Sequence, residues 1–383
     1  MFQRLKDACR GPWYKKAIII ISLLLASFYP IYKNYYYARG TQQYERHVRF
    51  MEGRSEFFNP WQYRILCPLL IESAKWAYDH SIDKLIPAET VIHFDEKKAE
   101  DETAVFQSQL NNKETFIYLL IFIAFRLALH AAIYALGFAL FACFTRSNWL
   151  VGFALLFVSF CMGNGAHNSD LSFNTYMDLV LFLWMACIVL YRKNDWWILP
   201  VTVLGALNRE TALLIPGLYF LAAAVMRPEG KPLFGWTWLR IPAPRVWGIT
   251  LASLAVFFVI FFAIRNYYGF RPPDLVSVHQ VPLGLRLLKL NLLSGQAVKT
   301  YFEIYGVLGM LPLTCLLSFR YNSMLLRIWA LPLVPVWLGV HLIGSMAAES
   351  RYYLIPLMLV LLPMLLEMIE REYAGRIAAR RPA

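Results

Sequence analysis

The chain has 383 residues, of which 58% are hydrophobic and only 16% are charged. Soluble domains carry about a quarter charged residues, so this composition excludes a soluble globular protein and indicates a helical protein that crosses a membrane several times. The net charge of +12 does not indicate nucleic-acid binding, because the basic residues lie in segments between apolar runs and no soluble basic domain is present.

We predict an all-α, polytopic fold in which the whole chain, 1–383, forms one integral membrane domain. Roughly ten stretches are long enough, or nearly so, to cross a bilayer, which takes about 20 apolar residues. They lie at about 17–32, 115–144, 149–162, 175–191, 196–207, 211–226, 247–265, 304–319, 328–346 and 353–369. The stretches at 149–162 and 196–207 are short, so we expect partial spans among the ten.

A long segment, 33–113, follows the first apolar stretch and is predicted to be an outer loop. Within it, NPWQYRILCPLLIESAKWAY places Leu69 and Leu70 beside Glu72 and Lys75. This pattern is typical of an amphipathic helix that lies on the membrane, here at about residues 60–80. The charge-dense run HFDEKKAEDET predicts a solvated stretch before the second span. A second outer loop is predicted at 266–303.

Basic residues in alternate connections set the predicted orientation, because cytoplasmic loops are enriched in Lys and Arg. The residues that we place on the cytoplasmic side are Arg4, Lys6, Arg10, Lys15, Lys16, Arg146, Arg192, Lys193, Arg227, Lys231, Arg240, Arg245, Arg320, Arg327, Arg371, Arg376, Arg380 and Arg381. Both termini are then cytoplasmic, and the long loops lie on the opposite side, which is the periplasm in a bacterium or the lumen in a eukaryote. The outer loops are basic too, which fits either solvated surface charge or a surface for an anionic lipid phosphate.

Two charged islands interrupt apolar sequence on the predicted outer side. One contains Asn208, Arg209 and Glu210, and the other contains Glu349 and Arg351. An ionised side chain inside a membrane helix costs roughly 2.5–3.5 kcal/mol, so such residues indicate a polar cleft with a function. The structural alternative is that Glu210 pairs with Arg209 or Arg351 and neutralises charge at a helix break.

Carboxylates on the predicted outer side are the candidate catalytic groups. Glu45 is the first candidate, within RGTQQYERHVRFMEGRSEF, which also holds Glu52 and Glu56. Asp170 is the second, in the loop GNGAHNSDLSFNT, where His167 and Asn168 are supporting polar residues. A carboxylate in such a position can act as a general base on a hydroxyl group.

Arginines on the same side are the candidate anion-binding groups. Arg64, Arg209 and Arg351 are predicted to hold a phosphate, because guanidinium groups bind phosphate bidentately and stabilise its charge. His167 and Asp170 could hold a metal ion, but two ligands in one loop do not define a site, so no metal is predicted.

Two further cations have structural interpretations. Arg126, which shares one face of the second predicted helix with His130, is expected to pack against another helix or reach a carbonyl group. Arg265, at the outer end of the seventh stretch, is interpreted as an interface anchor.

Three stretches resemble the C-type (GT-C) superfamily of membrane glycosyltransferases. A first helix followed by a large outer loop with juxtamembrane helices is similar to that superfamily, and so is MDLVLFLWMACIVLYRKNDWWILPVTVLGALNRETALLIPGLYFL. ESRYYLIPLMLVLLPML resembles the start of a late helix in these enzymes, and NPWQYRILCPLL is similar to a mostly uncharacterised bacterial branch. The likeness covers about a third of the chain.

The resemblance implies transfer of a sugar from a polyprenyl-phosphate or polyprenyl-diphosphate donor to a glycan, lipid or protein acceptor at the periplasmic face, with inversion. A carboxylate of the first outer loop would be the base, and arginines would hold the donor phosphate. Such enzymes usually carry an Asp shortly after the first helix, whereas this chain reads ARGTQQYERH. Glu45 is the nearest acid.

Other functions remain open on the sequence. A lipid-linked glycan polymerase, ligase or flippase-like protein would share the basic outer face. A non-catalytic protein with the GT-C fold would explain the missing Asp. A transporter would be expected to show internal repeats, and this chain has polar breaks but no repeat of fixed period.

Overall fold

The computed structural model describes residues 12–37, 42–56, 58–91, 111–168, 173–225, 240–272 and 283–380. Across these ranges the chain folds into helices and short turns, and no β-strand occurs within them. The helices are α2 (Trp13–Tyr37), α3 (Gln43–Met51), α4 (Leu66–Ala77), α5 (Asp83–Leu85), α6 (Ala88–Val91), α8 (Lys113–Phe141), α9 (Asn148–Asn168), α10 (Phe173–Leu190), α11 (Ile198–Asn208), α12 (Leu214–Ala224), α13 (Pro244–Tyr268), α14 (Leu285–Leu293), α15 (Gly295–Leu308), α16 (Leu311–Ser318), α17 (Met324–Gly344), α18 (Leu354–Pro356) and α19 (Leu362–Arg380).

The prediction of an all-helical, multi-pass membrane protein is confirmed at that level. Six helical segments in the described ranges are long and apolar enough to cross a bilayer, namely α8, α9, α10, α13, α17 and Ser350–Glu372. A seventh arises if α15 and the following Leu311–Tyr321, bent by 70°, count as one span. The predicted number of ten is not confirmed.

Two of the ten predicted stretches are too short to count as spans. The stretch at 196–207 forms α11, which has 11 residues, and the stretch at 211–226 lies in the short apolar segment Glu210–Ala224. An 11-residue helix is about 16 Å long, roughly half of the 30 Å hydrocarbon core. The expectation of partial spans is therefore met at 196–207 and also at 211–226, which meet at the NRE triplet, but not at 149–162, which lies in a helix long enough to cross the bilayer.

Both predicted outer loops contain helices. In the first, α4 runs from Leu66 to Ala77 and buries Leu66, Cys67 and Ile71 against the bundle, while Leu69 and Trp76 are exposed. This is the amphipathic helix expected at about 60–80. In the second, the described part holds α14 and the beginning of α15.

Local sequence signals explain where the long helices begin. Asn112 caps α8 by accepting a hydrogen bond from the Thr115 backbone N–H at 3.1 Å. Pro244 opens α13, where its missing N–H leaves no helical hydrogen bond unmade. The bundle core holds large side chains, and the indole N–H of Trp329 and of Trp337 each donates to a backbone carbonyl, at 3.0 and 2.6 Å.

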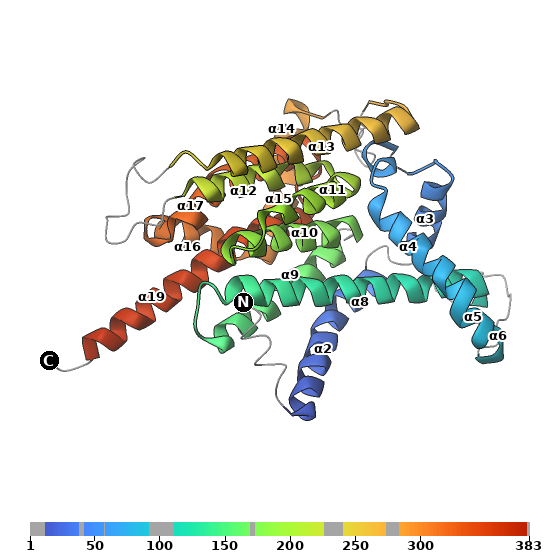
Figure 1. The fold of residues 1–383 in the computed structure, drawn as a ribbon, viewed down its shortest axis with the longest axis horizontal. Coiled ribbons are helices and arrows are strands. Elements are labelled where there is room, and N and C mark those ends of the chain that lie inside the picture. Colours follow the sequence, from blue (N-terminus) through green and yellow to red (C-terminus); the bar gives the residue numbers. More distant parts are fainter. Residues whose placement is uncertain are drawn as a thin grey trace.

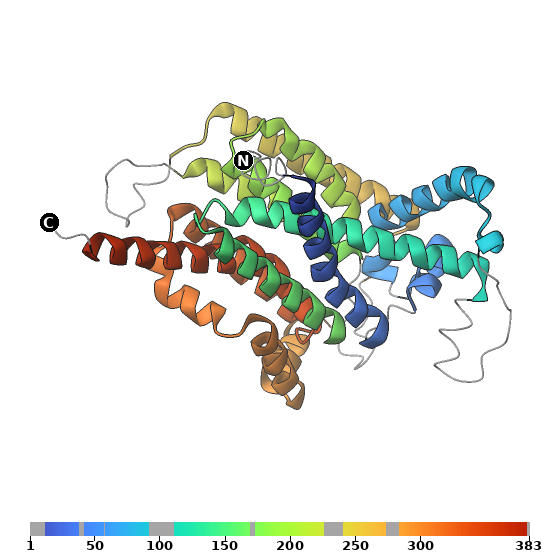
Figure 2. The same ribbon diagram turned by 90° about the horizontal axis from the view of Figure 1, so that it is seen from below.

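The long helices connect two ends of the molecule. In both views α3–α6 lie at one end and the C-terminal part of α19 at the other (Figures 1 and 2). Helix α8 runs between them (Figure 1), and the sequences of α10, α13 and α17 hold polar residues near both of their ends. These helix ends form the two sites described below.

Candidate functional site

The NRE triplet lies where α11 stops. The backbone N–H of Arg209 donates to the Gly205 carbonyl at 2.8 Å, and Arg209 itself is extended, with φ −158° and ψ 154°. A 3₁₀ turn, Glu210–Leu213, follows. A Cβ at Gly205 would lie 2.5 Å from the Ala212 Cβ, so the turn can fold back on α11 only because residue 205 has no side chain. The tight reversal explains why this apolar stretch is broken.

A buried ion pair anchors the triplet to α10. The Arg209 guanidinium lies 3.1 Å from an Asp178 carboxylate oxygen, and Asp178 is fully buried. Asp178 also accepts hydrogen bonds from the Asn208 amide at 2.6 Å and from the Thr211 hydroxyl at 3.1 Å. A buried charge is tolerated when it is paired and hydrogen-bonded in this way. Asn208 and Arg209 are thus fixed by a single acid.

Asn208 makes a second set of hydrogen bonds. Its amide donates to the backbone carbonyl of Asn174 at 2.9 Å, and the Asn174 amide donates back to the Asn208 side-chain oxygen at 3.2 Å. The Cys67 thiol of α4 donates to the same oxygen at 3.5 Å. Asn208 therefore joins α4 of the outer loop to α10 and α11.

Glu210 has different partners from those proposed on the sequence. Its carboxylate accepts from Arg265 at 2.9 Å and from Arg64 at 3.4 Å, whereas Arg209 pairs with Asp178. The Arg265 guanidinium also lies over the Tyr63 and Phe261 rings, 4.4 and 3.5 Å from their centroids. Arg265 thus belongs to this cluster, and its interpretation as an interface anchor is wrong because it turns inward to the acid.

The second island joins the first. Arg351 donates to Glu349 and, at 3.3 Å, to the Tyr352 hydroxyl. Arg64, Arg209 and Arg351 all lie within electrostatic range of one imidazole, that of His341 near the end of α17. We call the group of Arg64, Arg209, Arg265, Arg351, Asp178, Glu210 and Glu349 the arginine site. Arg64 thus joins the NRE triplet through Glu210, whereas the printed partners of Arg351 are its neighbours Glu349 and Tyr352.

Arg64 occupies the boundary between the arginine site and the outer loop. Burial lowers the pKa of its guanidinium, while the nearby Glu210 carboxylate opposes that change. Only 15% of its side chain is exposed, and its contact with Glu210, at 3.4 Å, is long for a charge-assisted hydrogen bond. A desolvated cation with a weak partner is a good binding group for an anion.

A small pocket adjoins Arg64 on the side of α3 and α4. We call it the outer pocket; its volume is about 80 Å³ and it is lined by Gln43, Arg46, His47, Phe50, Ser55, Glu56, Trp61, Arg64, Cys67, Pro68, Ile71, Phe173 and Asn174. Arg46 pairs with Glu56 at 3.1 Å and lies 5.4 Å above the Trp61 ring. Two arginines, an acid and an indole around one cavity suit a polar ligand with a negative charge.

The predicted catalytic carboxylates lie elsewhere or outside the described residues. Glu45 pairs with Arg49 one helical turn away on α3, and 57% of its side chain is exposed. Asp170 falls between the described ranges 111–168 and 173–225. His167 and Asn168 close α9, and their side chains are not described. The acid of the first outer loop that lines the outer pocket with Arg64 is Glu56.

Several residues of the site were missed on the sequence. Asp178 stands within the apolar run YMDLVLFLW, so the signal that marked Arg209, a charge inside a membrane stretch, could have found it. The imidazole of His47 is hydrogen-bonded to Glu72 at 2.7 Å, and the Tyr118 hydroxyl donates to the same carboxylate oxygen at 2.8 Å. No sequence spacing indicates that contact, because Tyr118 lies on α8.

Arg126 is fully buried, as an intramembrane arginine with a structural role would be. It donates to the Gln43 side-chain oxygen at 3.3 Å and lies 4.5 Å from the Phe173 ring centroid. The predicted hydrogen bond to a carbonyl group is therefore made to the side-chain amide oxygen of Gln43. In the described ranges, no group of three or more His, Cys, Asp or Glu side chains is arranged to hold a metal ion.

Comparisons of the chain with known protein families, with curated proteins and with solved structures found no match. The function is therefore argued from the site alone.

Proposed function

We propose that the arginine site binds the phosphate of a lipid-linked sugar and that the chain is a membrane glycosyltransferase acting at the periplasmic face. The observation that supports this is that Arg64 and Arg265, from distant parts of the chain, both pair with Glu210, next to the buried Arg209. Arginine is the side chain best suited to hold a phosphate and to stabilise its charge as it leaves. A bacterial inner-membrane location belongs to the same proposal.

The four arginines of the site have different parts in this proposal. Arg209 is paired with Asp178, and Arg351 is paired with Glu349. Both arginines are therefore held in place and would orient the ligand. Arg64 and Arg265 share one acid, Glu210, which leaves the site with one positive charge in excess. A donor phosphate would take the place of Glu210 on Arg64, whose contact with that acid is the longer of the two.

The reaction would be a single displacement. A carboxylate takes the proton of the acceptor hydroxyl, the hydroxyl oxygen forms a bond to the anomeric carbon, and the bond from that carbon to the phosphate oxygen breaks with inversion. The polyprenyl phosphate leaves with the bonding electrons, stabilised by the arginines. Glu45 and Asp170 remain predicted bases, and we add Glu56 because it lines the outer pocket with Arg64.

The test uses the purified full-length chain in lipid nanodiscs with a panel of radiolabelled polyprenyl-phosphate and polyprenyl-diphosphate sugars. Transfer of label to a water-soluble or lipid acceptor is measured for the wild type and for Glu45→Gln, Glu56→Gln and Asp170→Asn. We expect one of these to abolish transfer while binding of polyprenyl phosphate persists. If transfer is unchanged in all three, the assignment of a carboxylate base is wrong.

Binding is measured separately, by the change in melting temperature on adding undecaprenyl phosphate. Arg64→Gln should remove that change, while Arg49→Gln, which neutralises an exposed arginine of the same outer region, should keep it. Binding without transfer would favour a flippase-like or non-catalytic protein. Transfer that extends one glycan through many sugars would favour a polymerase.

A further inference from the structure

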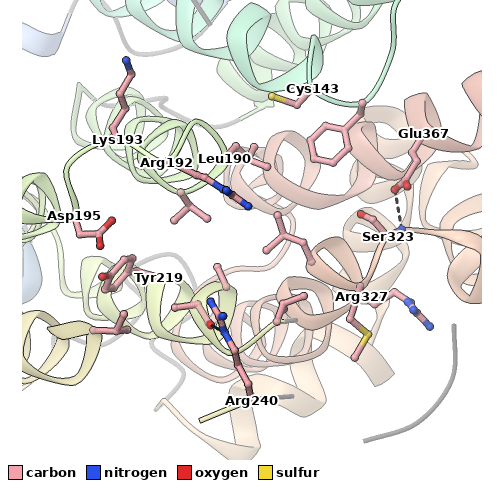
Figure 3. A pocket seen from close by; sticks show the side chains of 18 of the residues that line it. Cys143, Leu190, Arg192, Lys193, Asp195, Tyr219, Arg240, Ser323, Arg327 and Glu367 are labelled. Carbon is pink, nitrogen blue, oxygen red and sulfur yellow. Dashed lines mark hydrogen bonds between the residues drawn. The ribbon is translucent and has the colours of Figure 1, made fainter. Parts of the chain in front are cut away.

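A second, larger cavity lies at the opposite end of the bundle from the arginine site. Its volume is about 1870 Å³, and its walls come from the ends of α8, α10 and α12, the beginnings of α13 and α17, and the middle of α19 (Figure 3). Helices α10, α13 and α17 each reach the arginine site with their other end. We call it the basic cavity; it does not depend on the proposed function.

Six basic side chains line the basic cavity against three acidic ones. The basic residues are Arg192, Lys193, Arg240, Arg245, Arg327 and Arg371, and the acidic ones are Asp195, Glu367 and Glu370. All six belong to the residues that the sequence places on the cytoplasmic side. Topology alone requires only that such residues lie on one side of the membrane, whereas here four separate segments direct them at one cavity.

The acids are engaged at the rim. Glu367 pairs with Arg371 at 2.6 Å and accepts the Ser323 backbone N–H at 2.8 Å. Glu370 accepts from the Thr145 hydroxyl at 2.7 Å. Asp195 lies 4.0 Å from Arg245. The positive charge that remains in the middle of the cavity is therefore not cancelled by these acids.

Arg192 is the most unusual residue of the basic cavity. Its φ is +47°, in the left-handed region, and the backbone N–H groups of Arg192 and Lys193 donate to the carbonyls of Val189 and Ile188 at 3.3 and 3.0 Å. This is the Schellman ending of α10, in which the left-handed position is usually Gly. An arginine that occupies it against its backbone preference indicates a use for the side chain.

The Arg192 side chain extends into the middle of the basic cavity, where it makes no hydrogen bond or ion pair with any described residue (Figure 3). Arg240 points toward the same space from the opposite wall (Figure 3). Its Nε donates to the Ala223 carbonyl at 3.3 Å, which helps to fix the guanidinium in the wall of the cavity. Two guanidinium groups facing one space can hold a phosphate between them.

The surroundings favour an amphiphile over a freely soluble anion. Val189, Leu190 and Leu325 line the basic cavity beside the arginines, so apolar and basic surfaces meet in it. Trp196, also in its wall, is 56% exposed, and Trp247 nearby on α13 is 45% exposed. Exposed tryptophans at the ends of spanning helices mark the level of the lipid headgroups.

We propose that the basic cavity binds a phosphate group at the predicted cytoplasmic face, in the form of an anionic phospholipid headgroup held between Arg192 and Arg240. The phosphate lies between the two guanidinium groups, and the glycerol and upper acyl carbons lie along the apolar wall. Recognition depends on net negative charge, so a zwitterionic headgroup binds more weakly.

The experiment is a native mass spectrometry titration of the full-length chain in detergent with phosphatidylglycerol and, separately, with phosphatidylcholine. We expect a clear preference for phosphatidylglycerol in the wild type. Arg192→Gly should weaken that binding about fivefold, the effect of one basic residue near a lipid surface, and Arg240→Gln should do the same. Arg192→Gly removes the charge and gives the left-handed position its preferred residue, so the fold should be retained.

Two controls separate this site from diffuse charge. Arg192→Lys should keep most of the affinity, and Arg146→Ala, which removes a positive charge at the same end outside the cavity lining, should keep all of it. Equal binding of the two lipids, or equal losses in Arg192→Gly and Arg146→Ala, would overturn the proposal. Displacement by millimolar inorganic phosphate, with no preference between lipids, would assign a soluble ligand and overturn the lipid assignment.

Discussion

The arginine site and the basic cavity hold the same kinds of side chain at opposite ends of the same helices, yet they differ in how the charges are compensated. In the arginine site, Asp178, Glu210 and Glu349 each pair with at least one arginine, and Asp178 is fully buried. In the basic cavity the arginine at the centre, Arg192, has no partner within the described ranges. Depth explains the difference.

Charges packed inside the bundle must be paired, because the unpaired state is costly in a low-dielectric interior. Charges in an open cavity are hydrated, so they can remain unpaired until a ligand binds. The arginine site is thus a structural element as well as a candidate binding site, whereas Arg192 in the basic cavity pairs with no described residue.

The largest effect is expected from Asp178→Ala. The change leaves Arg209 buried without its acid, 6% exposed, and removes the acceptor of Asn208 and Thr211. Breaking a buried pair from one side costs about 3–5 kcal/mol of unfolding free energy. Reversible unfolding of the detergent-solubilised protein measures this loss. Glu45→Ala, at an exposed pair, is the control and should be close to the wild type; equal stability of the two variants would contradict a structural role for Asp178.

Gly205→Ala tests whether the helix reversal positions the arginine site. The new Cβ would lie 2.5 Å from that of Ala212, so the turn that carries Arg209 and Glu210 must shift. Overpacking of this kind costs about 1–3 kcal/mol. Gly217→Ala is a matched control on the next helix, because no atom lies within 4 Å of a Cβ there. The unfolding free energy and the affinity for undecaprenyl phosphate should both fall in Gly205→Ala, and neither should fall in Gly217→Ala.

Arg64→Gln separates binding from stability. Arg64 makes the longer of the two contacts with Glu210, and Arg265 remains to compensate that acid. Hydrogen bonds to charged groups contribute about 1.5–3 kcal/mol, so the affinity for undecaprenyl phosphate should fall at least about tenfold. The melting temperature without ligand should change little. A large loss of stability with unchanged binding would make Arg64 a structural residue.

Arg192→Gly should raise the unfolding free energy, whereas Asp178→Ala and Gly205→Ala should lower it. Relief of the left-handed backbone conformation stabilises the folded state by about 1–2 kcal/mol, and the greater freedom of Gly in the unfolded chain offsets about half of that. The net gain is about 0.5–1 kcal/mol in unfolding free energy. A loss of stability would show that the Arg192 side chain supports the fold, and would contradict the contrast between the paired charges of the arginine site and the unpaired Arg192.

The smallest effect concerns pH at the outer loop. Lys113 donates to Asp83 at 3.0 Å, and this hydrogen bond holds the pKa of the Asp83 carboxyl below its usual value. A lowered folded-state pKa means that the stabilisation is present above the unfolded pKa and is lost as the pH falls through the folded one. The wild type should melt above Asp83→Asn near neutral pH, and the difference should shrink as the pH falls through the lowered pKa of the Asp83 carboxyl in the folded state. A constant difference would exclude this pair as its cause.

Much of this molecule could be predicted from local pattern. The apolar stretches became helices, the amphipathic stretch after Arg64 became α4, and the alternate basic connections converged at one end. These features depend on residues near one another in the chain. Lengths were harder: the stretch ending at the NRE triplet forms a helix too short to span, because Gly205 and Ala212 allow the chain to reverse there.

The partners in the arginine site could not be predicted in the same way. The sequence identified Glu210 as an acid among arginines, yet its partners come from residue 64 and residue 265, more than fifty positions away on either side. Local spacing says nothing about which distant side chains meet. The sequence suggested Glu210 as a partner for Arg209, whereas the actual partner is Asp178, a charge inside another apolar stretch.

Hydrophobic length and local charge are enough to predict a multi-pass helical membrane protein with two polar islands and basic residues in alternate connections. Which charges pair with one another and which remain available depends on how the helices pack in three dimensions. Ion pairing in a helical bundle depends on which helices lie side by side, so Arg209 meets Asp178 across a helix interface while Arg192 reaches into an open cavity.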